Sequence, residues 1–316
     1  MKRKPKKKKG QLLKILEYVT ISALVYMTRI TPLPIVKFIS NTAGNLLYFI
    51  SSRRRNIAIN NLTHAFRYEM SAKKIRRLAR SSCQAFFFTF LEAIKMRYVF
   101  ARHDAFETLR QTTDNLEELY DKAKQYHQKY GACIFVTPHI GNWEMLPMVC
   151  SHIEIPLAVV ARPLDNEYLE KLLFANRISE GQVLIPKTNA MFVLQKTLKR
   201  GISIGMLPDQ STAKGVLIDF FKRQATTTPV PAILAINYNK PVIVVACCRK
   251  PGSYKYEGFI SEPILPGNYT SEKDEIIRIT TAITKEMEKI IRKYPNQYLW
   301  IHNRWKTYKG RKAVMS

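Results

Sequence analysis

From residue 131 to its end, this 316-residue chain alternates short β-rich runs with longer segments of helical pattern. Strand and helix in alternation are typical of an α/β layer architecture, in which helices connect parallel strands and cover the sheet. The pattern therefore predicts a mostly parallel, mixed central sheet flanked by helices, with ligands at the carboxyl ends of its strands. The expected strands are 133–137, 157–161, 183–186, 202–206, 216–220 and 241–248, and the expected helices are 142–152, 166–180, 189–200, 229–239 and 271–293.

Two apolar segments near the N-terminus, residues 12–30 and 35–50, predict a pair of membrane-associated helices. Pro32 and Pro34 stand between them and would end the first helix. Charged residues interrupt the first segment, which leaves an apolar run shorter than the roughly 20 residues of a spanning helix. Lysines precede the pair and the arginines at 53–55 follow it, so both flanks are expected on the cytoplasmic side. We therefore favour a re-entrant or interfacial hairpin over a single tilted span, and over a cleaved signal peptide.

The motif VTPHIGNWEM, residues 136–145, opens where a β-rich run ends and a helical segment begins. His139 and Glu144 stand five positions apart, Gly141 permits a tight turn, and Asn142 is suited to cap the following helix. Across such a turn the carboxylate can hold one ring nitrogen as donor and leave the other to accept a proton. A histidine near a glutamate is more often structural, but this position after a strand favours His139 as general base and Glu144 as its orienting partner.

A protein nucleophile does not accompany this pair in the sequence. The chain holds no GxSxG motif, and neither Cys150 nor Ser151 lies in a plausible nucleophile elbow. The attacking oxygen is therefore expected to belong to the substrate. Direct attack of an alcohol on a thioester is the most economical reaction for such a base.

The segment HIGNWE resembles the H-x4-E signature of the lysophospholipid acyltransferase superfamily, and its flanks resemble the branch of lipid A biosynthesis lauroyl and myristoyl acyltransferases. The resemblance extends over residues 40–306 and implies a glycerol-3-phosphate acyltransferase-like fold. Four further blocks agree in order and spacing, namely VVARPLDNEYLEKLL (159–173), GMLPDQ (205–210), FFKRQATTTPVPAILA (220–235) and QYLWIHNRWK (297–306).

Four residues in these blocks acquire substrate-binding roles from the resemblance. Arg162 suits an anionic group of the acceptor, because a guanidinium grips phosphate or carboxylate with two hydrogen bonds. Its alternative is an ion pair with Asp209 or another acid. Asp209 and Gln210 end a β-rich run and are expected to position the substrate or Arg162. Asn166 either contacts the substrate or caps the next helix.

One segment departs from the family. Where the family usually has Phe-Phe-Gly, this chain has Phe220, Phe221 and Lys222. A lost glycine removes easy access to positive φ, so we expect a loop of different shape. The added charge at Lys222 and Arg223 either contacts lipid phosphates or an acidic carrier, or is simply solvated.

The formal net charge of +27, from 51 Lys and Arg against 24 Asp and Glu, requires an anionic partner. Nucleic acid, anionic lipid and an acidic carrier protein all qualify. We divide the chain into a basic tail (1–10), a membrane-anchoring helical segment (11–52), a helical region leading into the catalytic domain (53–130) and an α/β acyltransferase core (131–316). The five cysteines lack metal-ligand spacing and are expected as reduced core side chains.

The resemblance implies an acyltransferase of lipopolysaccharide biosynthesis at the bacterial inner membrane, with its catalytic domain on the cytoplasmic side. Acyl carrier protein would be the donor, a Kdo-bearing lipid A precursor the anionic glycolipid acceptor, and inner membrane lipid a further partner, with no metal or redox cofactor. Acylation of a phosphatidylinositol mannoside, or of another glycolipid or lysophospholipid, is a near alternative, and a membrane-attached esterase would use the same residues with water. Nucleic acid is not an expected partner, because the chain lacks helix-turn-helix, RNA-recognition and zinc-finger signatures.

Overall fold

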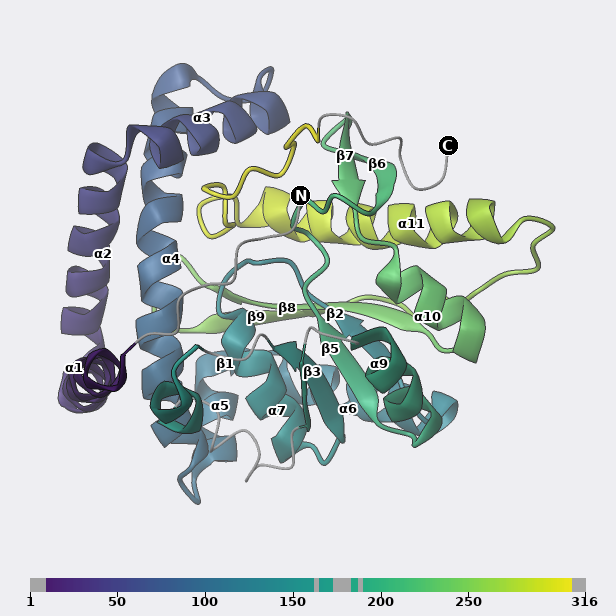
Figure 1. Cartoon of the computed structure of the whole chain (residues 1–316), viewed down its shortest axis with the longest axis horizontal. Helices are drawn as coiled ribbons and strands as arrows, with labels where there is room; N and C mark the ends of the chain where they lie inside the picture. Colours follow the sequence, from purple (N-terminus) through teal and green to yellow (C-terminus); the bar gives the residue numbers. More distant parts are fainter. Residues whose placement is uncertain (1–9, 162–164, 173–182, 187–189, 309–316) are drawn as a thin grey trace.

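The computed structural model describes residues 10–161, 165–172, 183–186 and 190–308 of the chain. Its centre is a seven-stranded sheet in the order β1-β9-β8-β2-β5-β3-β4, with helices on both faces (Figure 1). Neighbouring strands are parallel except for the antiparallel pair β8 and β9. This confirms the mostly parallel mixed sheet. The strands are β1 (Thr113–Asp114), β2 (Ile134–Val136), β3 (Leu157–Ala161), β4 (Val183–Pro186), β5 (Ser203–Met206), β8 (Val242–Arg249) and β9 (Tyr256–Ile260).

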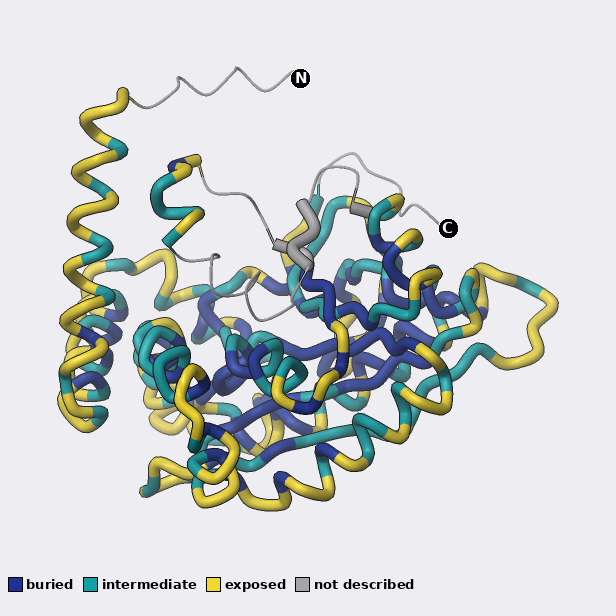
Figure 2. The backbone as a smooth tube through the Cα atoms, turned by 90° about the horizontal axis from the view of Figure 1, so that it is seen from below, coloured by how far each residue is buried: buried dark blue, intermediate teal, exposed yellow. Residues whose placement is uncertain are grey.

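Alternate residues of the central strands point to opposite faces of the sheet, and each face has its own apolar core. In β2, Ile134 and Val136 belong to one core and Phe135 to the other. Because both faces are covered, the strands are apolar throughout, and they form the buried centre of the molecule in Figure 2. The first core is covered by α9 (Ala190–Lys199), α10 (Val230–Tyr238) and α11 (Glu272–Lys293), and the second by α5 (Ala105–Thr112), α6 (Leu116–Tyr130) and α7 (Leu146–His152).

A long helix, α4 (Ala72–Phe100), stands at one edge of the sheet and joins both cores. Two further helices, α2 (Leu33–Ile50) and α3 (Ser52–Phe66), pack against it (Figure 1). Gly44 lets α2 approach closely, because a Cβ atom at this position would lie 2.4 Å from the Cα of Gln84. The helical pattern that was predicted ahead of the α/β core is therefore present, and it forms a helical wall beside the sheet.

The N-terminal helix α1 (Gln11–Ile30) ends just before Pro32, as predicted. It crosses the end of α2 instead of lying beside it, which differs from the expected hairpin (Figures 1 and 2). Within the described residues, no helix combines the length and apolar character needed to span a membrane. Both helices nevertheless expose large apolar side chains to more than half of their full extent, namely Leu12, Leu16, Val19, Tyr26, Met27, Ile30, Phe38, Leu46, Phe49 and Ile50.

The run predicted at 216–220 is a strand, but it lies outside the main sheet. This strand, β6 (Val216–Phe220), forms an antiparallel hairpin with β7 (Arg223–Thr227). Phe221 and Lys222 make the connecting turn with φ of 50° and 62°. Two positive φ values are typical of a type I′ turn, in which Asn-Gly is the favoured pair. The turn thus adopts positive φ without a glycine, held by a 2.7 Å hydrogen bond from the Phe221 backbone N–H to Glu288.

Candidate active site

His139 lies at the carboxyl edge of the sheet, directly after β2. Val136 ends β2 and is in register with Met206, the last residue of the parallel neighbour β5. The segments that leave these strands bring His139 and Asp209 together. The Nδ1 atom of His139 is 2.6 Å from Asp209 Oδ1, and its backbone N–H donates to Asp209 Oδ2 at 2.9 Å. One carboxylate therefore holds both the ring and the backbone of this histidine.

Gln210 occupies the other side of the imidazole. Its Nε2 atom lies 3.2 Å from Nε2 of His139. Because an amide NH2 donates and an ionised carboxylate accepts, the consistent arrangement has the proton on Nδ1 and a lone pair on Nε2. Trp143 packs edge-on against the ring, with the two centroids 5.2 Å apart. A substrate hydroxyl that displaced the Gln210 amide would therefore meet an oriented proton acceptor.

His139 and Asp209 each stabilise the charged form of the other. Burial alone would lower the pKa of His139, but the charge and hydrogen bond of Asp209 and the charge of Glu144 raise that pKa above its ordinary value. Burial alone would raise the pKa of Asp209, but the charge and hydrogen bonds of His139 lower it. Asp209 therefore stays ionised and stabilises a proton on the imidazole, which is the state that a general base reaches in the transition state.

The C-terminal block, residues 297–306, is distant in sequence from His139 and Asp209 but lies close to them in the structure. The backbone N–H of Leu299 donates to the His139 carbonyl at 3.0 Å. Arg304 is only 3% exposed and donates to the Thr226 carbonyl and the Thr227 hydroxyl. Its charge helps to lower the pKa of Asp209. The block is therefore part of the electrostatic support of the histidine and not only a cover for the sheet.

The turn after His139 depends on a close backbone approach. Gly141 has a φ of 58°, and a Cβ atom there would lie 2.0 Å from the Cys247 carbonyl oxygen. That carbonyl accepts from the backbone N–H of Asn142 at 2.9 Å, and the Gly141 carbonyl accepts from the Thr89 hydroxyl at 2.7 Å. The glycine of the motif is thus required by contact with β8, and the turn is pinned on two sides.

A buried ion pair supports the same turn. Glu92 of α4 and Arg249 of β8 are 2.6 Å apart, and their side chains are 2% and 12% exposed. Glu92 also accepts from the Asn142 side chain at 2.6 Å, and Arg249 donates to Thr89 at 3.0 Å. The asparagine of the motif therefore connects the turn to α4 through a buried carboxylate, instead of capping a helix as expected.

Glu144 lies in the 3-10 helix η1 (Trp143–Met145) and is half-buried. Its charge contributes to the raised pKa of His139. The orienting contact at Nδ1, however, is made by Asp209. The reason is topological, because adjacent parallel strands deliver His139 and Asp209 to the same edge of the sheet. Asp209 and Gln210 thus lie at the candidate site, in more direct contact with His139 than we expected.

Two other predicted residues have a different outcome. Asn166 is buried, and its side-chain NH2 donates to the Lys14 carbonyl at 2.8 Å and to Glu17 at 3.2 Å. Its side-chain oxygen accepts from the backbone N–H of Tyr168. This amide joins α1 to the core and caps a short helical segment, which is the second of the two roles considered for it. Arg162 lies outside the described residues.

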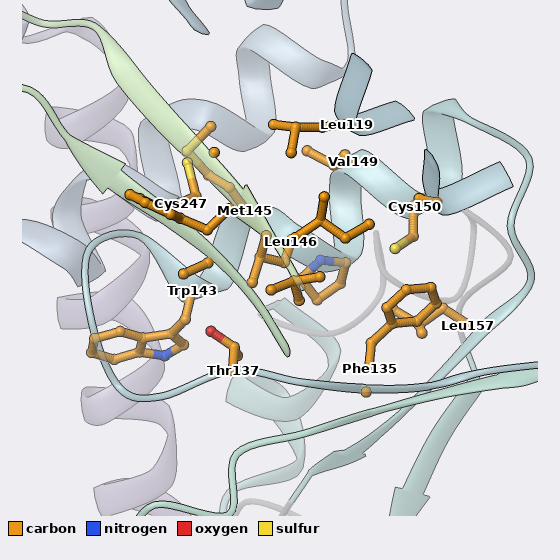
Figure 3. A pocket seen from close by; sticks show the side chains of 18 of the residues that line it. Leu119, Phe135, Thr137, Trp143, Met145, Leu146, Val149, Cys150, Leu157 and Cys247 are labelled. Atoms are coloured by element: carbon orange, nitrogen blue, oxygen red, sulfur yellow. The ribbon is translucent and has the colours of Figure 1, made fainter. Parts of the chain in front are cut away.

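An apolar cavity of about 120 Å³ lies beside the turn that follows His139, on the face covered by α6 and α7 (Figure 3). Trp143, whose ring contacts His139, is on one side of it together with Thr137, and Cys150 and Leu157 are on the other. Among the described residues, no charged side chain lines it. Such a cavity suits a hydrocarbon chain whose reactive end lies near the imidazole.

Comparison with known proteins places this sequence in a family. The model of the bacterial lipid A biosynthesis acyltransferases matches residues 4–307. The chain is 24% identical to the lipid A biosynthesis palmitoleoyltransferase of Escherichia coli, over 87% of this chain and 86% of that protein. It is 26% identical to the lauroyltransferase of the same organism, over 47% of this chain and 48% of that protein. It is also 27% identical to the phosphatidylinositol mannoside acyltransferase of Mycolicibacterium smegmatis, over 54% of this chain and 56% of that protein. The chain belongs to the bacterial lipid A biosynthesis acyltransferase family.

Proposed function

We propose that this protein is a late acyltransferase of lipid A biosynthesis that moves a fatty acyl chain from acyl carrier protein to a hydroxyl of a Kdo-bearing lipid A precursor. The observation that carries the proposal is the imidazole of His139, held at Nδ1 by Asp209 and placed beside an apolar cavity. Family membership supports the reaction class. The base, its carboxylate and a cavity for the chain are the parts that acyl transfer to an alcohol needs.

In the proposed reaction, His139 Nε2 takes the proton of the acceptor hydroxyl as its oxygen attacks the thioester carbonyl carbon. The tetrahedral intermediate then expels the carrier thiolate, which receives the proton from the imidazolium. Asp209 stabilises that imidazolium between the two steps. Glu144 adds a second negative charge near the ring. Arg162 remains our proposal for the anionic group of the acceptor, on the resemblance of its block alone.

The apolar surfaces fit the same reaction. The cavity beside Trp143 would hold the first part of the acyl chain close to the base. The exposed side chains of α1 and α2 bury apolar area on contact with lipid, at about 25 cal/mol for each Å² removed from water. We therefore propose that these helices lie on the cytoplasmic face of the inner membrane, where the basic chain also meets anionic lipid.

The test is mass spectrometry of lipid A from a host without its own late acyltransferases, expressing either this protein or its His139→Ala variant. We expect one added acyl chain with the natural protein and its loss in the variant. His103→Ala, at an exposed histidine between α4 and α5, is the matched control and should keep the added chain. An unchanged lipid A with the natural protein would contradict the proposal. Release of free fatty acid without acceptor would instead favour the esterase.

A further inference from the structure

A second cavity, of about 300 Å³, opens between the β6–β7 hairpin and the C-terminal end of the described chain. We call it the hairpin pocket. It differs from the cavity beside Trp143 in its chemistry, because two cations and two aromatic rings contribute to its wall. Among the residues that line it are Gly215, Arg223, Trp305, Lys306 and Tyr308.

The two cations of the hairpin pocket are exposed and available to a ligand. Arg223 lies over the Trp305 ring, 5.9 Å from its centroid, and Lys306 lies 5.0 Å from the centroid of Tyr308. Neither forms an ion pair with any residue in the described part of the chain. Two cations that converge on one concave site without an acidic partner favour binding of an anion.

The wall of the pocket is built and not merely left open. The indole N–H of Trp305 donates to the Arg223 carbonyl at 3.2 Å, which ties the C-terminal segment to the hairpin. At another part of the wall, a Cβ atom at Gly215 would lie 2.3 Å from the Thr227 carbonyl oxygen. A glycine is therefore needed for that side of the wall to pack against β7.

Hydrogen bonds connect the hairpin pocket to the catalytic base. The hydroxyls of Tyr308 and Ser211 are 3.1 Å apart, and Ser211 directly follows Gln210, whose amide contacts Nε2 of His139. The wall of the pocket therefore contacts the segment whose Gln210 side chain contacts His139. The turn that lacks the family's glycine adjoins the pocket without lining it, since Arg223, which does line the pocket, follows Lys222 directly.

We infer that the hairpin pocket binds the phosphorylated sugar headgroup of the acceptor, through Arg223 and Lys306. This inference rests on the proposed function and names the part of the acceptor that the second cavity takes. The guanidinium and ammonium groups would hold the phosphate, and the aromatic rings would contact the sugar. The apolar cavity then takes the acyl chain, so that the two substrates approach His139 from different sides.

A docking site for the acidic carrier protein is the other use of these charges. A cavity of about 300 Å³ is at the lower end of the range for small-ligand sites. A helix of the carrier, about 10 Å across, would not enter it. The concave shape therefore favours a small anionic group over a protein surface.

The experiment measures initial rates for the Arg223→Ala and Lys306→Ala variants of the full-length protein. One substrate is varied at a time, either the acyl carrier thioester or the phosphorylated lipid A precursor. Lys222→Ala is the matched control, because it removes a neighbouring exposed cation that does not line the pocket. We expect each pocket variant to raise the acceptor KM about tenfold, since a charge-assisted hydrogen bond is lost, and to leave the donor KM unchanged.

A second arm repeats the rates with the same lipid after phosphatase treatment, on which Arg223→Ala should equal the natural protein. A third arm measures equilibrium binding of the phosphorylated lipid in detergent micelles, without donor. It should show the same tenfold weakening for Arg223→Ala and none for Lys222→Ala. A raised donor KM, equal losses on both lipids, or an effect of Lys222→Ala of the same size would overturn the inference. If the natural protein transfers no acyl chain, the proposed function fails, and the binding arm still decides on the pocket.

Discussion

The carboxylate of Asp209 is the most informative single group to change. Asp209→Asn keeps the shape of the side chain and an oxygen that can accept from the His139 backbone N–H, which Asp209 Oδ2 does now at 2.9 Å. The amide NH2 then faces Nδ1 in place of the oxygen that lies 2.6 Å away, which favours the wrong tautomer of the ring. The variant should therefore fold and place His139 correctly while failing to support it as a base.

The size of the loss follows from the charges. When His139 takes the proton, its positive charge lies about 4 Å from the carboxylate, and such a pair is worth about 4 kcal/mol at an effective dielectric constant near 20. That energy corresponds to about a thousandfold in kcat. Asp209 raises the pKa of His139, so the variant should have a lower pKa at this residue. The part of the pH–rate profile in which the rate increases with pH should therefore move to lower pH in the variant.

The assay is a steady-state rate measurement from pH 5.5 to 9, with micellar acceptor and acyl carrier thioester. Asp219→Asn, at an exposed carboxylate of β6, is the control and should retain the natural rate. If kcat falls by less than about tenfold and the rise of the rate with pH occurs at the same pH as in the natural protein, Asp209 does not support the base. In that case Glu144 would be the carboxylate to examine.

Three further changes test other parts of the structure. Lys222→Gly should raise the free energy of unfolding by about 1 kcal/mol in urea titrations, because it relieves a non-glycine residue at positive φ; an equal or lower denaturation midpoint would contradict the turn conformation. Glu92→Gln should lower that free energy by about 3 kcal/mol, since it leaves Arg249 buried without its partner, and should reduce kcat through the turn at Asn142; a fully stable variant would rule this out. The pKa of His139 is raised on folding, so protonated His139 contributes to the free energy of unfolding. This contribution is present below the unfolded pKa of about 6.5 and is lost as the pH rises through the folded pKa. The melting temperature of the natural protein should therefore fall with rising pH relative to that of His139→Gln. Parallel plots of melting temperature against pH for the two proteins would exclude this contribution.

The strands and helices of the α/β core were predictable because they are local patterns. The apolar runs at 157–161 and 183–186 became β3 and β4 with the bounds that were predicted. The hairpin of β6 and β7 was not predictable, because nothing in a five-residue run shows which strand it will pair with. Phe221 and Lys222 carry no turn signal, since the positive φ there is held by tertiary contacts such as the bond to Glu288.

The candidate site divides in the same way. His139 was found from its position after a strand and inside a Gly-Asn-Trp turn, both of which are local signals. Its carboxylate partner was assigned to Glu144, which is near in sequence, whereas Asp209 is the residue hydrogen bonded to the ring. Glu92 and Arg249 were not singled out at all. A signal existed for them, since each is a charged residue within or directly after an apolar segment, and such a residue is usually paired when it is buried.

The sequence by itself determined the class of fold, the position of the candidate base and the membership of the family, because these depend on periodicity and on motifs within short windows. Only the tertiary structure decided which carboxylate holds His139, why Gly141 cannot be replaced, and which cavities adjoin the site. The physical reason is that a parallel sheet brings together the ends of strands that are distant along the chain. Hydrogen bonds and charges act over a few ångströms of space, and sequence separation does not measure that distance.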